Sequence, residues 1–328
     1  MTSADHVLSC SWSIKATLPS RLVAAVFALI YGTALASLPI LLFQDRENYL
    51  VYADESLAIL LRYAERGVLP LITNEPVWLL INSALGAVLV PADVLRVLIF
   101  VSATIVAYRV LRADARNAFW LLLFLLLPQI VKNHIVHLRQ GVAIAVFLLG
   151  WFSRRKTWWI AALAVTPLIH ASFFFILLLV AISALSRWSR LGPDVRLSAF
   201  ASLGLGLGWS LGVIASILGA RQAEVYSFTA ADVSGLGFLF WASILVLMIM
   251  QGKSFLRQHT LEVAIICFYL STYFLVEVAA RIFESGLILV LLACLHLTSW
   301  RKWTALGGIA GFGVIQWVPR FAQPVWGF

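Results

Sequence analysis

The sequence predicts an all-α protein, a polytopic helical bundle with about 10–12 membrane segments, some of them re-entrant or interfacial. Two properties of the composition predict this class: 62% of the 328 residues are hydrophobic and only 12% are charged, with a mean hydropathy of +0.95. In soluble domains roughly a quarter of all residues are charged. This chain therefore has too few polar side chains to cover the surface of a water-soluble protein. A third observation is that residues 22–43 and 197–220 are uncharged, and each stretch reaches the roughly 20 residues that one crossing requires.

The basic residues predict the topology. They give a net charge of +9, and they gather in short segments between apolar stretches, which favours the cytoplasmic side of a membrane over a nucleic-acid interface. The clusters are Arg109, Arg112 and Arg116; Arg154, Arg155 and Lys156; Arg187, Arg190 and Arg196; Lys253 and Arg257; and Arg301 and Lys302. Between successive clusters the chain has to leave and return. The predicted outer turns lie near Arg139, His170, Arg221 and Arg281.

Two segments are expected to form helices that do not span the membrane as single straight crossings. The uncharged stretch around His170 is long for one crossing, which predicts two short helices over residues 158–169 and 172–185, tilted or re-entrant. Residues 57–72 are too charged to span and too apolar for a free loop. They predict an amphipathic helix at the membrane surface.

The chain is expected to hold one membrane domain. Residues 1–21 form a cytoplasmic tail, 22–318 a single transmembrane domain with an outer segment at 44–76, and 319–328 a C-terminal tail. The first apolar stretch lacks a signal-peptide cleavage site and is expected to be a retained anchor. Crossings at residues 77–90 and 94–110 would leave Arg109 outside, against its charge, so the number of crossings in this third of the chain stays open.

Cofactor chemistry is not indicated. The three cysteines, Cys10, Cys267 and Cys294, lack the paired spacing of a metal site or a disulfide framework. No glycine-rich phosphate loop occurs, so ATP hydrolysis within this chain is not expected. We therefore expect neither a metal nor another cofactor.

Ionisable residues in apolar surroundings are the candidates for function, because a bilayer makes them energetically costly. Arg139 opens the apolar stretch 137–150, where its guanidinium can grip two phosphate oxygens while the free N–H groups of a helix start assist. Gln140 adds a second polar side chain. The competing interpretation is an arginine that only extends to the membrane interface.

A general base is expected among three residues. His170 fits by residue type, because its ordinary pKa lies near neutral, although a core histidine bonded to a neighbouring helix explains it equally well. Asp45 and Glu75 compete with it, since burial can raise the pKa of a carboxyl group.

Further polar candidates lie later in the chain and in the first outer segment. Glu277, Arg281 and Glu284 have helical spacing, so they are either part of a site or an ion triad that makes the arginine tolerable in lipid. The remaining candidates are Tyr49, Arg221 and Tyr226.

A resemblance to the EpsG family of membrane polysaccharide polymerases, relatives of the Wzy-type O-antigen polymerases, rests on two central segments. They are HLRQGVAIAVFLLG at 137–150 and PLIHASFFFILLL at 167–179. Three further segments resemble the first outer loop, the start of the next helix and a late motif of that family. They are FQDRENYLVY at 43–52, NEPVW at 74–78 and VEVAARIFE at 276–284.

The resemblance implies a GT-C-like fold and a metal-independent glycosyltransferase at the outer face of the bacterial cytoplasmic (inner) membrane. Its substrates would be oligosaccharide units on undecaprenyl diphosphate, joined into a surface or exported polysaccharide with the lipid diphosphate as leaving group. The expected roles are Arg139, Arg281 and Arg221 as cations for the leaving group, His170, Asp45 or Glu75 as base, and Gln140, Tyr226, Glu277 and Tyr49 as contacts to diphosphate or glycan. A chain-length regulator and a flippase of the same pathway are expected partners.

Two other functions fit the same residues. A flippase or transporter of lipid-linked glycans also needs buried arginines, but it should have pseudo-symmetric halves, and no internal repeat is found. A membrane acyltransferase could use an outer histidine and arginine to activate an acyl donor.

Overall fold

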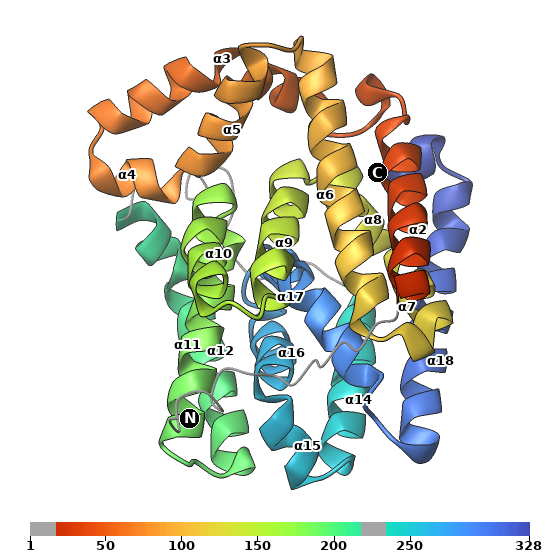
Figure 1. Ribbon diagram of the computed structural model, residues 1–328. Coiled ribbons are helices and arrows are strands. Elements are labelled where there is room, and N and C mark those ends of the chain that lie inside the picture. The colour runs from red at the N-terminus through yellow and green to blue at the C-terminus, as the bar shows by residue number, and fades with distance from the viewer. Residues whose placement is uncertain (1–17, 218–233) are drawn as a thin grey trace. The chain divides into compact units, whose positions relative to one another are not determined.

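The computed structural model describes residues 18–217 and 234–328 (Figure 1). Within these ranges the regular structure consists of sixteen α-helices and three short 3₁₀ helices, and no strand occurs. The predicted all-α class is therefore confirmed for the described part of the chain. The described residues group into an N-terminal unit, residues 18–173 and 313–328, and a central unit, residues 174–217 and 234–312.

The helices of the two units follow one another along the chain, and α11 and α18 each begin in one unit and end in the other. Those that begin in the N-terminal unit are α2 (Leu18–Ala36), η1 (Ile40–Leu42), α3 (Arg46–Glu65), α4 (Val68–Thr73), α5 (Pro76–Gly86), α6 (Pro91–Ala113), η2 (Ala115–Asn117), α7 (Ala118–Leu125), α8 (Pro128–Ile135), α9 (Leu138–Trp151), α10 (Lys156–Ile169), α11 (Ser172–Trp188) and η3 (Pro324–Gly327). Those that begin in the central unit are α12 (Pro193–Ile217), α14 (Leu236–Met250), α15 (Lys253–Gln258), α16 (Thr260–Thr272), α17 (Ala279–Cys294) and α18 (Ser299–Phe321).

Helices α9 and α10 form a tightly packed hairpin in the N-terminal unit. A Cβ added at Gly150 would lie 2.2 Å from the Cβ of Ala162, so the glycine allows the two helices to approach closely. Each helix has 14 residues and is therefore about 21 Å long. The first turn of α9 and the last turn of α10 consequently lie at the same end, remote from the basic turn at residues 152–155. We call this end the open end of the hairpin.

Gly150→Ala is expected to lower the free energy of unfolding by about 1–3 kcal/mol, because its methyl group has no space against Ala162. Gly206→Ala is the matched control, since nothing lies within 4 Å of a Cβ at that helical position and alanine favours a helix over glycine by up to about 1 kcal/mol. Thermal unfolding of the purified protein in detergent measures both changes. An unchanged or raised midpoint for Gly150→Ala would contradict the close packing of the hairpin.

Few of the described helices are long and apolar enough to cross a membrane. Among the described residues, only α6 is by itself long and apolar enough to cross a membrane. The pair Ala115–Leu125 and Pro128–Ile135 passes the same test jointly, with a bend of 66° between its halves, and Pro128 lies at this break because proline cannot continue the preceding helix. Seven shorter apolar helices of 10–17 residues accompany them. The expected multiple crossings and the single domain over residues 22–318 stay predictions.

Several predicted helices occur close to their expected bounds. Helices α10 and α11 confirm the two short helices expected on either side of His170. Helix α12 covers most of the uncharged stretch 197–220, whose last three residues lie outside the described residues.

The helix expected over residues 57–72 differs from the structure. Helix α3 begins eleven residues earlier, and α4 is a separate helix. Gly67 separates them with a φ of 116°, a conformation that side-chain-bearing residues rarely adopt and that ends the first helix. Figure 1 shows α3, α4 and α5 at one end of the N-terminal unit, beyond α9 and α10.

Candidate functional site

Glu75 lies at the start of α5, directly before Pro76, and proline is well suited to the first turn of a helix. The backbone of Glu75 has φ 63° and ψ 53°, a left-handed conformation that costs a non-glycine residue about 1–3 kcal/mol and that clusters at functional sites. The carboxylate makes no capping hydrogen bond to its own helix. The residue is nevertheless buried, with 3% exposure, so its side chain has to find partners elsewhere.

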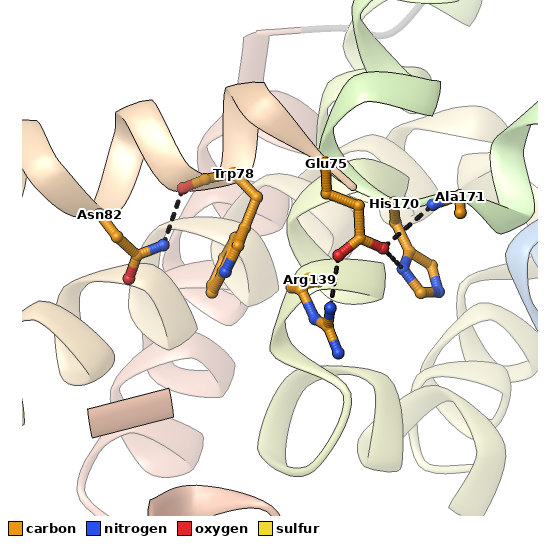
Figure 2. A network of polar contacts seen from close by, with 6 residues as sticks. All are labelled: Glu75, Trp78, Asn82, Arg139, His170 and Ala171. Atoms are coloured by element: carbon orange, nitrogen blue, oxygen red, sulfur yellow. Dashed lines mark hydrogen bonds and ion pairs between the residues drawn. The ribbon is translucent and has the colours of Figure 1, made fainter. Parts of the chain in front are cut away.

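These partners come from the open end of the α9–α10 hairpin (Figure 2). Arg139, in the first turn of α9, donates from Nη1 to Oε2 of Glu75. His170 follows α10, and its Nδ1 lies 2.8 Å from Oε1. The backbone N–H of Ala171 donates to the same oxygen at 3.2 Å. We call Glu75, Arg139 and His170 the Glu75 cluster.

The electrostatics of the cluster keep Glu75 ionised. Burial alone would raise the pKa of its carboxyl group, but the Arg139 guanidinium, the His170 ring and the Ala171 N–H together hold this pKa well below its ordinary value of 4.5. A carboxylate with so low a pKa is a poor base near neutral pH. Glu75 is therefore suited to orienting its partners, and His170 is the better candidate for the base.

The contact with Glu75 fixes the tautomer of His170. An ionised carboxylate only accepts hydrogen bonds, so the proton of a neutral imidazole lies on Nδ1. The lone pair is then on Nε2, the atom that would take a proton from a substrate. A carboxylate that holds the opposite nitrogen of a histidine is the arrangement that orients the base in serine hydrolases.

Aromatic rings surround the Arg139 guanidinium. Its Cζ lies 5.8 Å from the ring centre of Tyr49 and 5.5 Å from that of Tyr52, within the range of cation–π attraction. Tyr49 in turn packs edge-on against Trp78, with ring centres 5.8 Å apart. In Figure 2 the second terminal nitrogen of Arg139 points away from Glu75. The guanidinium of Arg139 therefore contacts the Glu75 carboxylate and the Tyr49 side chain together.

Other predicted site residues have different surroundings. Asp45 precedes α3, has an exposed side chain and makes no capping hydrogen bond, and the structure does not bring it to Glu75. Gln140 is fully buried on α9. Arg221 and Tyr226 lie outside the described residues.

Glu277 and Arg281 belong to the central unit, and the helical spacing on which the alternative of an ion triad with Glu284 depends is not found. Helix α17 begins only at Ala279, so Glu277 lies exposed in the preceding turn and does not share a helical face with the other two residues. Arg281 is half-buried in the first turn of α17.

The central unit holds a buried polar group that the sequence patterns did not indicate. His259 precedes α16 and is fully buried; its Nε2 lies 3.2 Å from Nδ1 of His296, and its Nδ1 lies 3.7 Å from the Glu262 carboxylate. The available signal was a histidine and a glutamate three residues apart in a predominantly apolar stretch. Within the described ranges, no three or more His, Cys, Asp and Glu residues are placed to hold a metal ion.

The Glu75 cluster combines an ionised carboxylate, a histidine with its lone pair on Nε2 and a guanidinium. Such a set can accept a proton and stabilise an anion at adjacent positions. Comparisons of the chain with protein-family models, with curated proteins and with solved structures find no match.

Proposed function

We propose that this chain is a metal-independent glycosyltransferase of a bacterial cytoplasmic membrane, a polymerase that joins oligosaccharide units carried on undecaprenyl diphosphate. One observation carries the proposal. Three residues in the segments that resemble EpsG-type polymerases, Glu75, Arg139 and His170, meet at one buried carboxylate. Arg139 and His170 are 64 and 95 residues from Glu75 in the chain, so the contact is a product of tertiary structure.

Uncovered apolar side chains support the membrane part of the proposal. On α2, Leu22 and Ile30 are 67% and 60% exposed, and on α12, Trp209 and Ile217 are 88% and 73% exposed. Large apolar patches on a protein surface mark contacts with lipid or with a partner. A polytopic, GT-C-like bundle with re-entrant helices would account for these faces and for the many short apolar helices.

In the proposed reaction, a hydroxyl group of the acceptor attacks the anomeric carbon of the donor. A new C–O bond forms, the bond from that carbon to the diphosphate oxygen breaks, and its electron pair leaves with the diphosphate. The hydroxyl proton passes to Nε2 of His170, and Glu75 stabilises the resulting imidazolium. Arg139 stabilises the charge that develops on the leaving group. His170 then releases the proton to water.

Polar atoms around the cluster support a polar substrate. Nε1 of Trp78, Oδ1 of Asn82 and Nε of Arg139 are buried without a hydrogen-bond partner in the described part of the chain. The amide nitrogen of Asn82 is occupied, because it donates to the Trp78 carbonyl at 2.9 Å (Figure 2). Leaving a buried polar group unpaired costs about 1–3 kcal/mol, which a sugar hydroxyl or a phosphate oxygen would recover.

The glycan profile of cells with and without this chain tests the function. Loss of a polymerase should leave single lipid-linked units, or caps of one unit, at the outer face, and His170→Gln should reproduce this loss at equal membrane abundance. Units retained at the inner face would indicate a flippase instead. Polymer of normal length that lacks acyl groups would indicate an acyltransferase, and either result would refute the polymerase.

The topology gives a separate prediction for the N-terminal unit. In a background with Cys10→Ser, Glu47→Cys in the first turn of α3 should react with a membrane-impermeant maleimide added outside spheroplasts. Arg155→Cys, in the basic turn of the hairpin, should react only after permeabilisation. Both positions are exposed, whereas Cys267 and Cys294 are buried. Reaction of position 155 from outside would overturn the orientation.

A further inference from the structure

Arg46, the first residue of α3, carries a buried charge that the described residues leave unpaired. It is 2% exposed, and its Nε and Nη1 are buried without a hydrogen-bond partner. The guanidinium lies 5.4 Å from the ring centre of Phe43. Among the described ion pairs none includes Arg46, and its neighbours Asp45 and Glu47 are exposed. A buried charge without a counter-charge destabilises a fold, so its retention points to a ligand that is an anion.

Tyr49 links Arg46 to the Glu75 cluster. Both residues belong to the buried face of α3, and side chains three residues apart on a helix are neighbours, with Cβ atoms about 5–6 Å apart. The ring of Tyr49 also contacts the Arg139 guanidinium, as described above. Tyr49 also interacts electrostatically with Arg46, so this tyrosine lies within reach of both arginines, Arg46 of its own helix and Arg139 of α9.

The charges of the two arginines are not equivalent. Glu75 balances the charge of Arg139 through their ion pair, so this pair offers an incoming anion no net positive charge. Arg46 has no such balance. The Asp45 side chain also does not cap the start of α3, and the positive end of a helix dipole attracts an anion.

We propose that Arg46 and the uncapped start of α3 form an oxyanion subsite for a diphosphate, beside the Glu75 cluster. In this arrangement Arg139 faces the phosphate attached to the sugar, and Arg46 holds the second phosphate. Two guanidinium groups beside one tyrosine match two linked phosphate groups better than a monophosphate. The assignment of this diphosphate to the lipid-linked donor rests on the proposed function.

Binding of farnesyl diphosphate to the purified full chain in detergent tests the subsite, with farnesyl monophosphate and inorganic pyrophosphate as parallel probes. Arg46→Met keeps the side-chain volume without the charge, and we expect it to weaken farnesyl diphosphate about tenfold or more, as for lost hydrogen bonds to a charged group. Arg46→Lys should have an intermediate affinity for farnesyl diphosphate. The substitutions should weaken the binding of farnesyl monophosphate less than that of farnesyl diphosphate. Arg62→Met, an exposed position on the same helix, is the control expected to bind like wild type.

The unfolding midpoint separates a binding role from a structural one. Because Arg46 lacks a counter-charge, Arg46→Met should unfold at the wild-type temperature or above it. Binding within threefold of wild type would overturn the subsite. The subsite would also be overturned if Arg46→Met and Arg46→Lys lost the same farnesyl diphosphate affinity and both unfolded at a lower temperature than wild type. Arg46 would then only support the fold.

The two smaller probes identify the source of the diphosphate. If Arg46→Met weakens the binding of pyrophosphate as much as that of farnesyl diphosphate, the subsite is assigned to a free diphosphate. If it weakens only the binding of farnesyl diphosphate, the subsite is assigned to a lipid. Arg46-dependent binding together with a glycan profile that does not change when the chain is removed from cells would refute only the polymerase.

Discussion

Glu75→Gln is expected to abolish polymer synthesis and to lower the free energy of unfolding by about 3 kcal/mol, the order found when one partner of a buried ion pair is removed. Glutamine leaves the half-buried Arg139 without its counter-charge. It also removes the negative charge that stabilises a protonated His170. Polymer length in cells and thermal unfolding of the purified protein measure the two effects independently.

The stability effect of Glu75→Gln should depend on pH. Because the pKa of Glu75 is lowered in the folded protein, its ionised form stabilises the fold above the ordinary value, and this contribution disappears as the pH falls through the folded-state pKa. The midpoints of wild type and variant should therefore differ at pH 7 and converge in strong acid. Glu55→Gln, exposed on α3, should stay within about 0.5 kcal/mol. Equal midpoints of Glu75→Gln and wild type at pH 7 would show that Glu75 is not paired with Arg139.

Arg139→Lys should fail almost as completely as Arg139→Ala, with polymer synthesis reduced about 10²–10³-fold, as when one donor to a developing anion is removed. Lysine keeps the charge but has a single ammonium group, which cannot hold Glu75 and present a second, fixed nitrogen to a phosphate. Rates of polymer formation at equal membrane abundance measure the loss.

Arg155→Lys is the matched control for Arg139→Lys. Arg155 is exposed in the basic turn of the hairpin, where only the positive charge matters for topology, so this variant should make normal polymer. Full polymer with Arg139→Lys would instead remove Arg139 from the contacts to the leaving group, and Arg281 would become the main candidate for that role.

The sequence predicted the helix ends that carry His170 and Glu75, because helix starts and breaks depend on residues that are close in the chain. An uncharged stretch too long for one crossing predicts a break at His170, and α10 and α11 place the break there. Glu75 before Pro76 was likewise expected at a helix start, where the structure has it. The meeting of Arg139 and His170 with Glu75 needed the close packing of α9 on α10, which no spacing in the sequence specifies.

Sequence patterns did not predict which charged residues are buried or which residues they pair with. Arg46 stands between two acidic residues in the sequence, which suggests a solvated charge cluster, yet only the arginine is buried. Glu75 was considered as a base because burial raises a carboxyl pKa, but three hydrogen-bonding partners outweigh burial in the folded protein. The helical spacing expected around Arg281 does not include Glu277, because α17 begins only at Ala279.

The equal lengths of α9 and α10 restrict where this chain can change in length. One residue inserted into either helix would turn the end of that helix by about 100° and advance it by about 1.5 Å, which would carry Arg139 or His170 away from Glu75. Residues added to the turn at 152–155 would leave both helix ends in place. Proteins that use the same three residues are therefore expected to differ in length at this turn and to keep the register of the two helices.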